Sequence, residues 1–78
     1  MWTKVSGRTD EWAPSDDPNH FLAVDLNDTD PCCVQWEVWE GWLHSGGCYQ
    51  TLSLHGDHEE ALGAATAEVA RRNQEGAV

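Results

Sequence analysis

The segment CVQWEVWEGW (residues 33–42) constrains the fold most, because it holds three of the five tryptophans and four of its apolar side chains recur at even-numbered positions. Successive side chains of a β-strand point to opposite faces, so this spacing predicts a strand with one buried face. The side chains expected on the buried face are Val34, Trp36, Val38 and Trp42. Those expected on the opposite face are Gln35, Glu37 and Trp39.

Two other segments have strand character, HFLAVDLN (20–27) and CYQTLSLH (48–55), and in the latter we expect Leu52 and Leu54 to point inward. DTDP (28–31) and HSGG (44–47) supply the turn residues between strands. Residues 57–73 predict a helix, with Asp57 as N-cap and Glu60 at the third helical position. Its apolar stripe is Ala61, Leu62, Ala65 and Val69.

These elements predict one α+β domain over residues 1–78, with the order β-β-β-α. A three-stranded antiparallel sheet (20–55) would carry one C-terminal helix (57–73) packed on one of its faces. Residues 1–19 are expected to form an irregular arm, because WAPSDDPN (12–19) combines two prolines with turn-forming residues.

Charge gives the clearest functional signal. The formal net charge is −10, and the only Lys and Arg residues are Lys4, Arg8, Arg71 and Arg72. Residues 9–70 therefore contain no Lys or Arg, whereas average composition would place about seven cations in a stretch this long. A chain that binds nucleic acid neutralises phosphates with Lys and Arg, so direct nucleic-acid binding is not expected.

The same distribution favours a basic partner, specifically a nucleic-acid-binding protein. Ten charges correspond to about 17 Å of duplex DNA, and a domain of this length is roughly 30 Å across. The linear charge density is thus within about a factor of two of that of DNA. The alternative explanations of the acidity are solubility or a halophilic proteome, and the binding of some other basic partner. The candidate partner-binding residues are Asp10, Glu11, Asp16, Asp17, Asp25, Asp28, Asp30, Glu37, Trp39, Glu40 and Tyr49.

Trp39 and Tyr49 are placed on the open face of the predicted sheet. Exposed aromatic side chains among polar groups are typical anchors at protein interfaces. An alternative is that the N-terminal arm folds over them, with Trp2 or Trp12 forming a second small core. The sequence does not separate these two arrangements.

No metal, cofactor or catalytic activity is expected. The potential zinc ligands Cys32, Cys33, His44, Cys48, His55 and His58 lack the paired spacing of zinc sites. Three cysteines are an odd number, which favours reduced, half-buried thiols over a disulfide framework. Thirteen carboxylates in residues 9–70 would raise a thiol pKa, and no cation there is available to hold an anionic substrate.

SLHGDHEEALGAATAEVARR (residues 53–72) is similar to the strand–turn–helix ending of HicB-type antitoxins, over about 20 of 78 residues. The resemblance implies an antitoxin-like subunit. The aromatic-glycine strand pattern and the DNA-binding extension of that family are missing. In size and acidity the chain is similar to small phage proteins that inhibit host defence or DNA-repair enzymes.

The sequence thus predicts a non-enzymatic phage- or mobile-element-type inhibitor that occupies the cationic groove of a nucleic-acid-handling host enzyme. The alternative is a regulatory module, either antitoxin-like or an accessory subunit, whose acidity is proteome background. No apolar run approaches the roughly 18 residues of a membrane span, and the start lacks the apolar region of a signal peptide. We therefore expect a cytoplasmic monomer or homodimer without membrane association.

Overall fold

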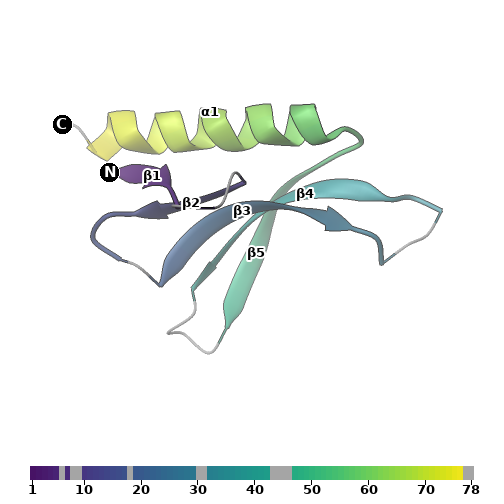
Figure 1. The fold of residues 1–78 in the computed structure, drawn as a ribbon, viewed down its shortest axis with the longest axis horizontal. Helices are drawn as coiled ribbons and strands as arrows, with labels where there is room; N and C mark the ends of the chain where they lie inside the picture. Colours follow the sequence, from purple (N-terminus) through teal and green to yellow (C-terminus); the bar gives the residue numbers. More distant parts are fainter. Residues whose placement is uncertain (6, 8–9, 18, 30–31, 43–46, 77–78) are drawn as a thin grey trace.

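The computed structural model describes residues 1–5, 7, 10–17, 19–29, 32–42 and 47–76. They form, in chain order, β1 (Trp2–Lys4), β2 (Glu11–Pro14), β3 (His20–Asn27), β4 (Gln35–Trp42), β5 (Cys48–His55) and α1 (His58–Gly76). The strands make one antiparallel sheet in the order β1-β2-β3-β4-β5, and α1 runs along one side of it (Figure 1). The fold is therefore α+β, with five strands and one helix.

The prediction of a three-stranded sheet is wrong, because the segment expected to be an irregular arm contributes β1 and β2. Trp12 lies opposite Leu22 in the β2–β3 register and is 4% exposed. Pro14 is the last residue of β2 and lies beyond Glu11 and Trp12, the two residues that pair with β3, so its missing N–H interrupts no bond of that ladder. This segment is ordered because it is buried against residues distant in the sequence. Its own turn-forming residues do not indicate such burial.

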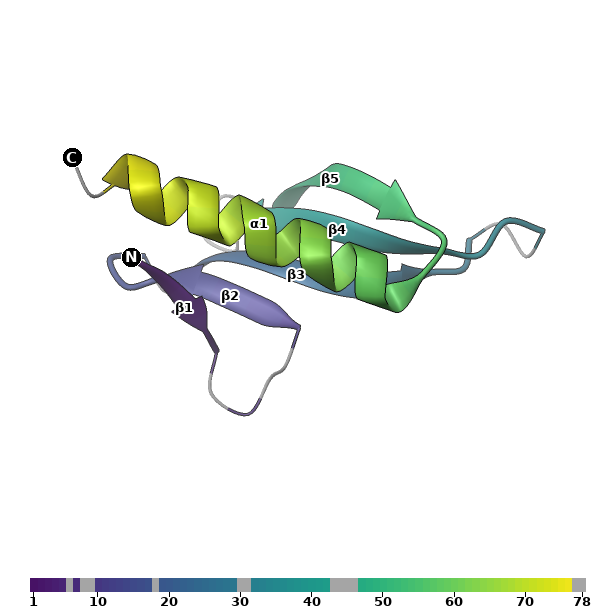
Figure 2. The same cartoon turned by 90° about the horizontal axis from the view of Figure 1, so that it is seen from above.

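The start of the chain is fastened to the end of the helix. The backbone N–H of Trp2 donates to Oδ1 of Asn73 at 2.7 Å, and Nδ2 of Asn73 donates to the carbonyl of Trp2 at 3.1 Å. Figures 1 and 2 show β1 beside the C-terminal part of α1. These two bonds join segments that are 71 residues apart.

The core lies between the sheet and α1. Its buried residues are Trp12, Leu22, Val24 and Val38 from the strands, and Ala61, Ala65 and Val69 from the helix. The two alanines are fully buried, which allows the helix backbone to lie close to the sheet. The predicted apolar stripe of the helix is confirmed, with Leu62 half-buried. The backbone N–H of Ala61 donates to the carbonyl of Asp57, as expected for an N-cap residue.

A bulge in β5 changes which of its side chains face the helix. Val38 pairs with Ser53 and Trp39 pairs with Thr51, so Leu52 is an extra residue without a counterpart in β4. One extra residue reverses the alternation of faces on either side of it. The predicted inward placement of Leu54 is therefore wrong: it lies opposite Glu37 and is 46% exposed. Leu52 is also exposed.

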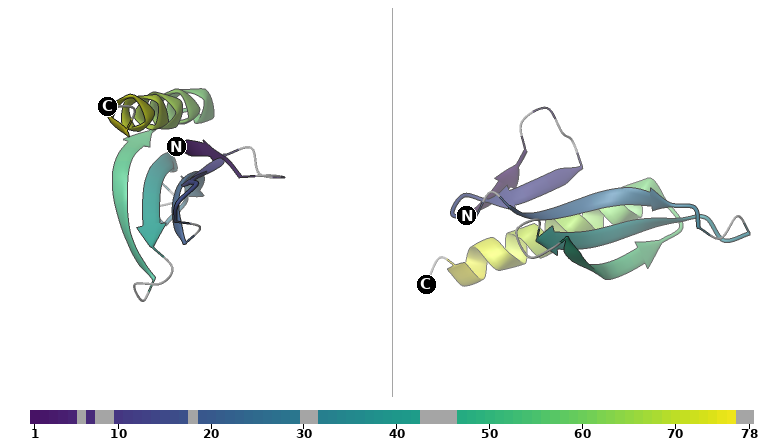
Figure 3. Two further views of the ribbon diagram at one scale, coloured as in Figure 1. Left: turned by 90° about the vertical axis from the view of Figure 1, so that its left-hand side faces the viewer. Right: turned by 90° about the horizontal axis from the view of Figure 1, so that it is seen from below.

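The other face of the sheet is open. Figure 3 shows the helix on one side of the curved sheet and, from below, strands that no other described element covers. Strand pairing places Ala23, Asp25, Glu37 and Trp39 together on this face, because residues directly opposite in adjacent strands share a side. Among the described residues, no helix has the combined length and apolar character needed to cross a membrane.

Candidate functional site

Three aromatic rings from three adjacent strands meet on the open face around Gly41. Phe21 of β3 and Tyr49 of β5 lie opposite Gly41 in the register. The rings of Phe21 and Trp39 meet edge-to-face with centroids 5.0 Å apart, and those of Trp39 and Tyr49 do so at 5.6 Å. A Cβ atom on Gly41 would lie 2.9 Å from Cζ of Phe21, so the glycine provides the space in which these rings pack.

Two carboxylates stand beside the rings. Asp25 and Glu37 are direct partners across β3 and β4, so their side chains share the open face. Nε1 of Trp39 donates to Oδ2 of Asp25 at 2.8 Å, while the Thr51 hydroxyl donates to Oε2 of Glu37. These bonds fix the orientation of both carboxylates, and each ionised carboxylate can accept about four hydrogen bonds.

Asp25, Glu37, Trp39 and Tyr49 together line a shallow, open hollow of about 270 Å³. These four residues were all predicted as partner-binding, and the structure brings them together at one place. Tyr49 is 66% exposed, so its ring is accessible from solvent. The hollow combines negative charge with aromatic surface, which are the two properties that bind organic cations.

The N-terminal tryptophans do not cover this hollow. Trp12 is in the core on the helix side of the sheet, and Trp2 lies edge-on to His20 at a centroid distance of 4.8 Å. Trp2 also lies under the guanidinium of Arg72, at 4.9 Å. The alternative of a second small core over Trp39 and Tyr49 is therefore wrong.

The remaining predicted residues are spread over the molecule. Glu11 pairs with Ala23 and so lies on the open face, two strands away from Glu37. Asp10 contacts His58 at the start of the helix, with Oδ2 and Nε2 3.1 Å apart. Asp16, Asp17 and Asp28 lie in the connections that follow β2 and β3, and Asp30 is outside the described residues.

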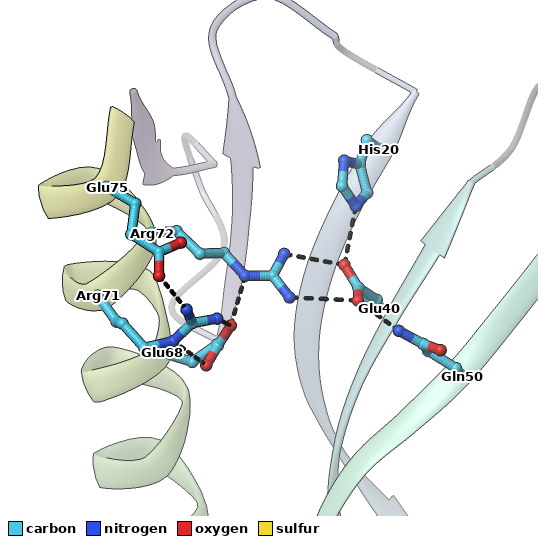
Figure 4. Close-up of polar contacts among 7 residues, drawn as sticks. All are labelled: His20, Glu40, Gln50, Glu68, Arg71, Arg72 and Glu75. Carbon is cyan, nitrogen blue, oxygen red and sulfur yellow. Dashed lines mark hydrogen bonds and ion pairs between the residues drawn. The ribbon is translucent and has the colours of Figure 1, made fainter. Parts of the chain in front are cut away.

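Glu40 was predicted to contact a partner, but it is 4% exposed and faces the helix. Its carboxylate receives both Nη atoms of Arg72, at 2.9 and 3.2 Å, and Nε2 of Gln50 at 2.7 Å (Figure 4). Nε2 of His20 lies 2.9 Å from Oε2, and Nε of Arg72 continues the network to Glu68 at 2.6 Å. Glu40 therefore joins the sheet to α1 and is not presented to a partner.

The network also governs the ionisation of Glu40. Burial by itself would raise the pKa of this carboxyl, but the hydrogen bonds from Arg72, His20 and Gln50 outweigh it and lower the pKa from 4.5 to about 2. Glu40 thus remains charged at neutral pH, and its charge is matched by that of Arg72.

The described cations are all engaged away from the hollow. Arg71 pairs with Glu68 and Glu75, while Arg72 pairs with Glu40 and Glu68. Nζ of Lys4 lies 5.6 Å from the ring centroid of Trp12, on the helix side of the sheet. In the described ranges, the hollow is consequently lined by carboxylates without a basic side chain.

The metal and thiol candidates do not form a site in the described part of the chain. No group of three or more His, Cys, Asp or Glu side chains is placed to hold a metal ion there. Cys32, Cys33 and Cys48 are exposed, so the expectation of half-buried thiols is wrong. His44 lies outside the described residues.

Sequence reasoning missed the role of Gly41. Gly41 pairs regularly with Phe21 and Tyr49, and the bulge occurs at Leu52 of the neighbouring strand. The signal was present, because a glycine within a strand that also carries Trp39 and Trp42 is typical of a site where a large group approaches the backbone.

No protein family matches this chain, and no curated protein or solved structure was found to be similar to it.

Proposed function

We propose that this protein is a stoichiometric inhibitor, of the kind encoded by phages and mobile elements, that binds a nucleic-acid-handling host enzyme in place of its nucleic acid. The observation that carries the proposal is the open sheet face, where Asp25 and Glu37 flank Trp39 and Tyr49. The carboxylates take the place of phosphates, and the rings take the place of stacked bases or fill a pocket of the enzyme.

The charge density of the whole molecule supports the same proposal. The chain has a net charge of −10 and a longest dimension of 43 Å. This corresponds to about one charge per 4 Å, compared with one per 3.4 Å along a single DNA strand. Binding in a cationic groove would release counterions from both partners, so the affinity should fall steeply with salt.

Such a target implies action in the cytoplasm, by binding and without turnover. The chain would occupy the groove as a monomer or as one subunit of a homodimer, with no cofactor. The acidic groups outside the hollow, such as Asp16, Asp17 and Asp28, would extend the negative surface and contribute mainly to the association rate.

The test is affinity capture from a lysate of the host cell at low salt, eluted with a salt gradient and followed by competition with DNA or RNA. We expect a nucleic-acid enzyme that is released at moderate salt and displaced by nucleic acid. Its activity should be inhibited at a one-to-one ratio with the purified protein. The target can then be used to compare variants of the open face.

The decisive variant is Glu37→Lys, with Glu75→Lys as the matched control. Both substitutions change the charge by the same amount, but Glu75 is an exposed helix residue whose only described ion pair is with Arg71. Glu37→Lys should weaken binding about tenfold or more, whereas Glu75→Lys should have little effect. Equal effects of the two variants would show that the sheet face is not the binding surface.

A captured partner that nucleic acid does not displace would overturn the mimicry proposal and favour the alternative of an antitoxin-like or accessory subunit. A broad set of basic proteins, released together at low salt, would mean that the acidity is a general property of the proteome. Comparing the isoelectric points of proteins from the same genome with the value of 4.4 for this chain would test that explanation directly.

A further inference from the structure

We propose that the open-face hollow binds one arginine side chain of the partner, with the guanidinium held by Asp25 and Glu37 against the rings of Trp39 and Tyr49. This inference rests on the proposed function, since it names the chemical group of the basic partner that the hollow receives. It also identifies the centre of the interface, where a few buried contacts normally supply most of the binding energy.

The first argument is the like-charge pair. Asp25 and Glu37 lie directly opposite each other in the β3–β4 register, an arrangement that destabilises a sheet. The four residues that line the hollow include no cation, and the described Lys and Arg side chains are engaged elsewhere. A positive group in the hollow would remove this repulsion. Relief of the repulsion would therefore contribute to the free energy of binding a cation.

The second argument is the preorganisation of the site. Asp25 is held by the indole N–H of Trp39, and Glu37 is held by the Thr51 hydroxyl and, at 3.5 Å, by Nδ2 of Asn27. The ring of Phe21 packs edge-to-face against the ring of Trp39 and helps to hold it in place. Because these side chains already have fixed positions, little conformational entropy remains to be lost when a ligand enters.

The third argument selects arginine over lysine. A guanidinium is planar, stacks on aromatic rings and can donate to two carboxylates at once, whereas an ammonium is compact and more strongly hydrated. Attraction between a cation and an aromatic ring contributes about 0.5–1 kcal/mol at an exposed site, which corresponds to roughly a two- to fivefold gain in affinity. The hollow of about 270 Å³ is open to solvent, so a side chain can enter from outside.

The experiment is a two-dimensional NMR titration of the ¹⁵N-labelled protein with N-acetyl-arginine methylamide at low salt. The indole N–H signal of Trp39, assigned with Trp39→Phe, reports on the hollow because this group donates to Asp25. We expect a saturable shift of this signal, with a weaker affinity for the corresponding lysine compound, because an ammonium is more strongly hydrated and lacks the planar fork of donors. Glu37→Gln should weaken arginine binding at least threefold, and Glu75→Gln should leave it unchanged.

Three results would overturn the inference: no saturable shift at the Trp39 signal, equal affinity for the arginine and lysine compounds, or equal effects of Glu37→Gln and Glu75→Gln. These outcomes are separable from a failure of the proposed function. If the hollow binds arginine but no captured partner is displaced by nucleic acid, the inhibitor proposal is wrong and the arginine site is still supported. If a nucleic-acid enzyme is captured but the Trp39 signal does not shift with the arginine compound, the inhibitor proposal is supported and the arginine site is wrong.

Discussion

Gly41 has no room for a side chain, since an added Cβ would lie 2.9 Å from Cζ of Phe21 and 3.3 Å from Cζ3 of Trp39. Gly41→Ala must therefore push these rings out of their edge-to-face contact. We expect it to lower the free energy of unfolding by about 1–3 kcal/mol, as overpacking substitutions do. Urea unfolding followed by tryptophan fluorescence measures this loss.

Gly63→Ala is the matched control for this substitution. Gly63 is an exposed residue inside α1, and no atom lies within 4 Å of a Cβ placed on it. Alanine is favoured over glycine in a helix by roughly 0.8–1 kcal/mol, so this variant should be stabilised. Equal effects of the two substitutions would contradict a packing role for Gly41.

The buried carboxylate of Glu40 provides a second prediction for a single residue. Glu40→Gln leaves the guanidinium of Arg72 buried with Glu68 as its remaining ionic partner. Breaking one side of a buried ion pair costs about 3–5 kcal/mol, a large part of the roughly 4–12 kcal/mol expected for a domain of this length. Replacing both residues by methionine should cost less than Glu40→Gln alone, and chemical unfolding of the three proteins tests this order.

The lowered pKa of Glu40 also sets a pH dependence. The folded state has a pKa of about 2 and the unfolded state a value near 4.5, so the folded state binds fewer protons between these values. This stabilisation is complete above about pH 4.5 and is lost as the pH falls toward 2. Urea midpoints of the wild type should fall through this window, while those of the double methionine variant should fall less.

At the level of the elements, β1 depends on its attachment to the helix. Asn73→Ala removes both hydrogen bonds to the Trp2 backbone, so β1 should open without unfolding of β3 and β4. Amide hydrogen exchange of β1 should accelerate severalfold, while overall stability falls by about 1–2 kcal/mol. Gln74→Ala, at the neighbouring exposed position, should change neither quantity.

The difference between β1–β2 and the other elements explains how far the sequence predicts this fold. Period-two alternation located β3, β4 and β5, and capping residues with an apolar stripe located the helix, because these signals are local. β1 and β2 exist through pairing and through burial of Trp12, so their short segments resemble turns when taken alone. The bulge at Leu52 is likewise a property of how two strands pair.

The same reasoning applies to the site. Parity placed Asp25, Glu37, Trp39 and Tyr49 on one face, and pairing of neighbouring strands then brought them together. Glu40 was predicted to bind a partner because of its charge, although it has the same parity as Val38 and therefore shares the core side of β4. Glu40 is buried because it pairs with Arg72, which lies 32 residues later in the chain. This contact depends on how the helix packs on the sheet, so the sequence pattern around Glu40 does not reveal it.

For the whole molecule, a net charge of −10 on 78 residues opposes the compact state through self-repulsion. Adding 0.1 M salt shortens the screening length to about 10 Å, so the urea midpoint should rise as sodium chloride is added at low concentration. Binding to the proposed basic partner should weaken over the same range. Stability and affinity are therefore expected to respond to salt in opposite directions.

Glu37→Gln tests whether the open face is the region where stability and binding affinity change in opposite directions. The substitution removes one charge of the Asp25–Glu37 pair and retains an oxygen that can accept from Thr51, so the protein should gain about 0.2–1 kcal/mol of stability. The same variant should bind the arginine compound and the partner more weakly. Glu75→Gln, which removes an equal charge but loses the ion pair with Arg71, should show neither change. A variant that is both more stable and a weaker binder would mean that the like-charge pair is retained for binding at the expense of stability; loss of stability in Glu37→Gln would contradict this.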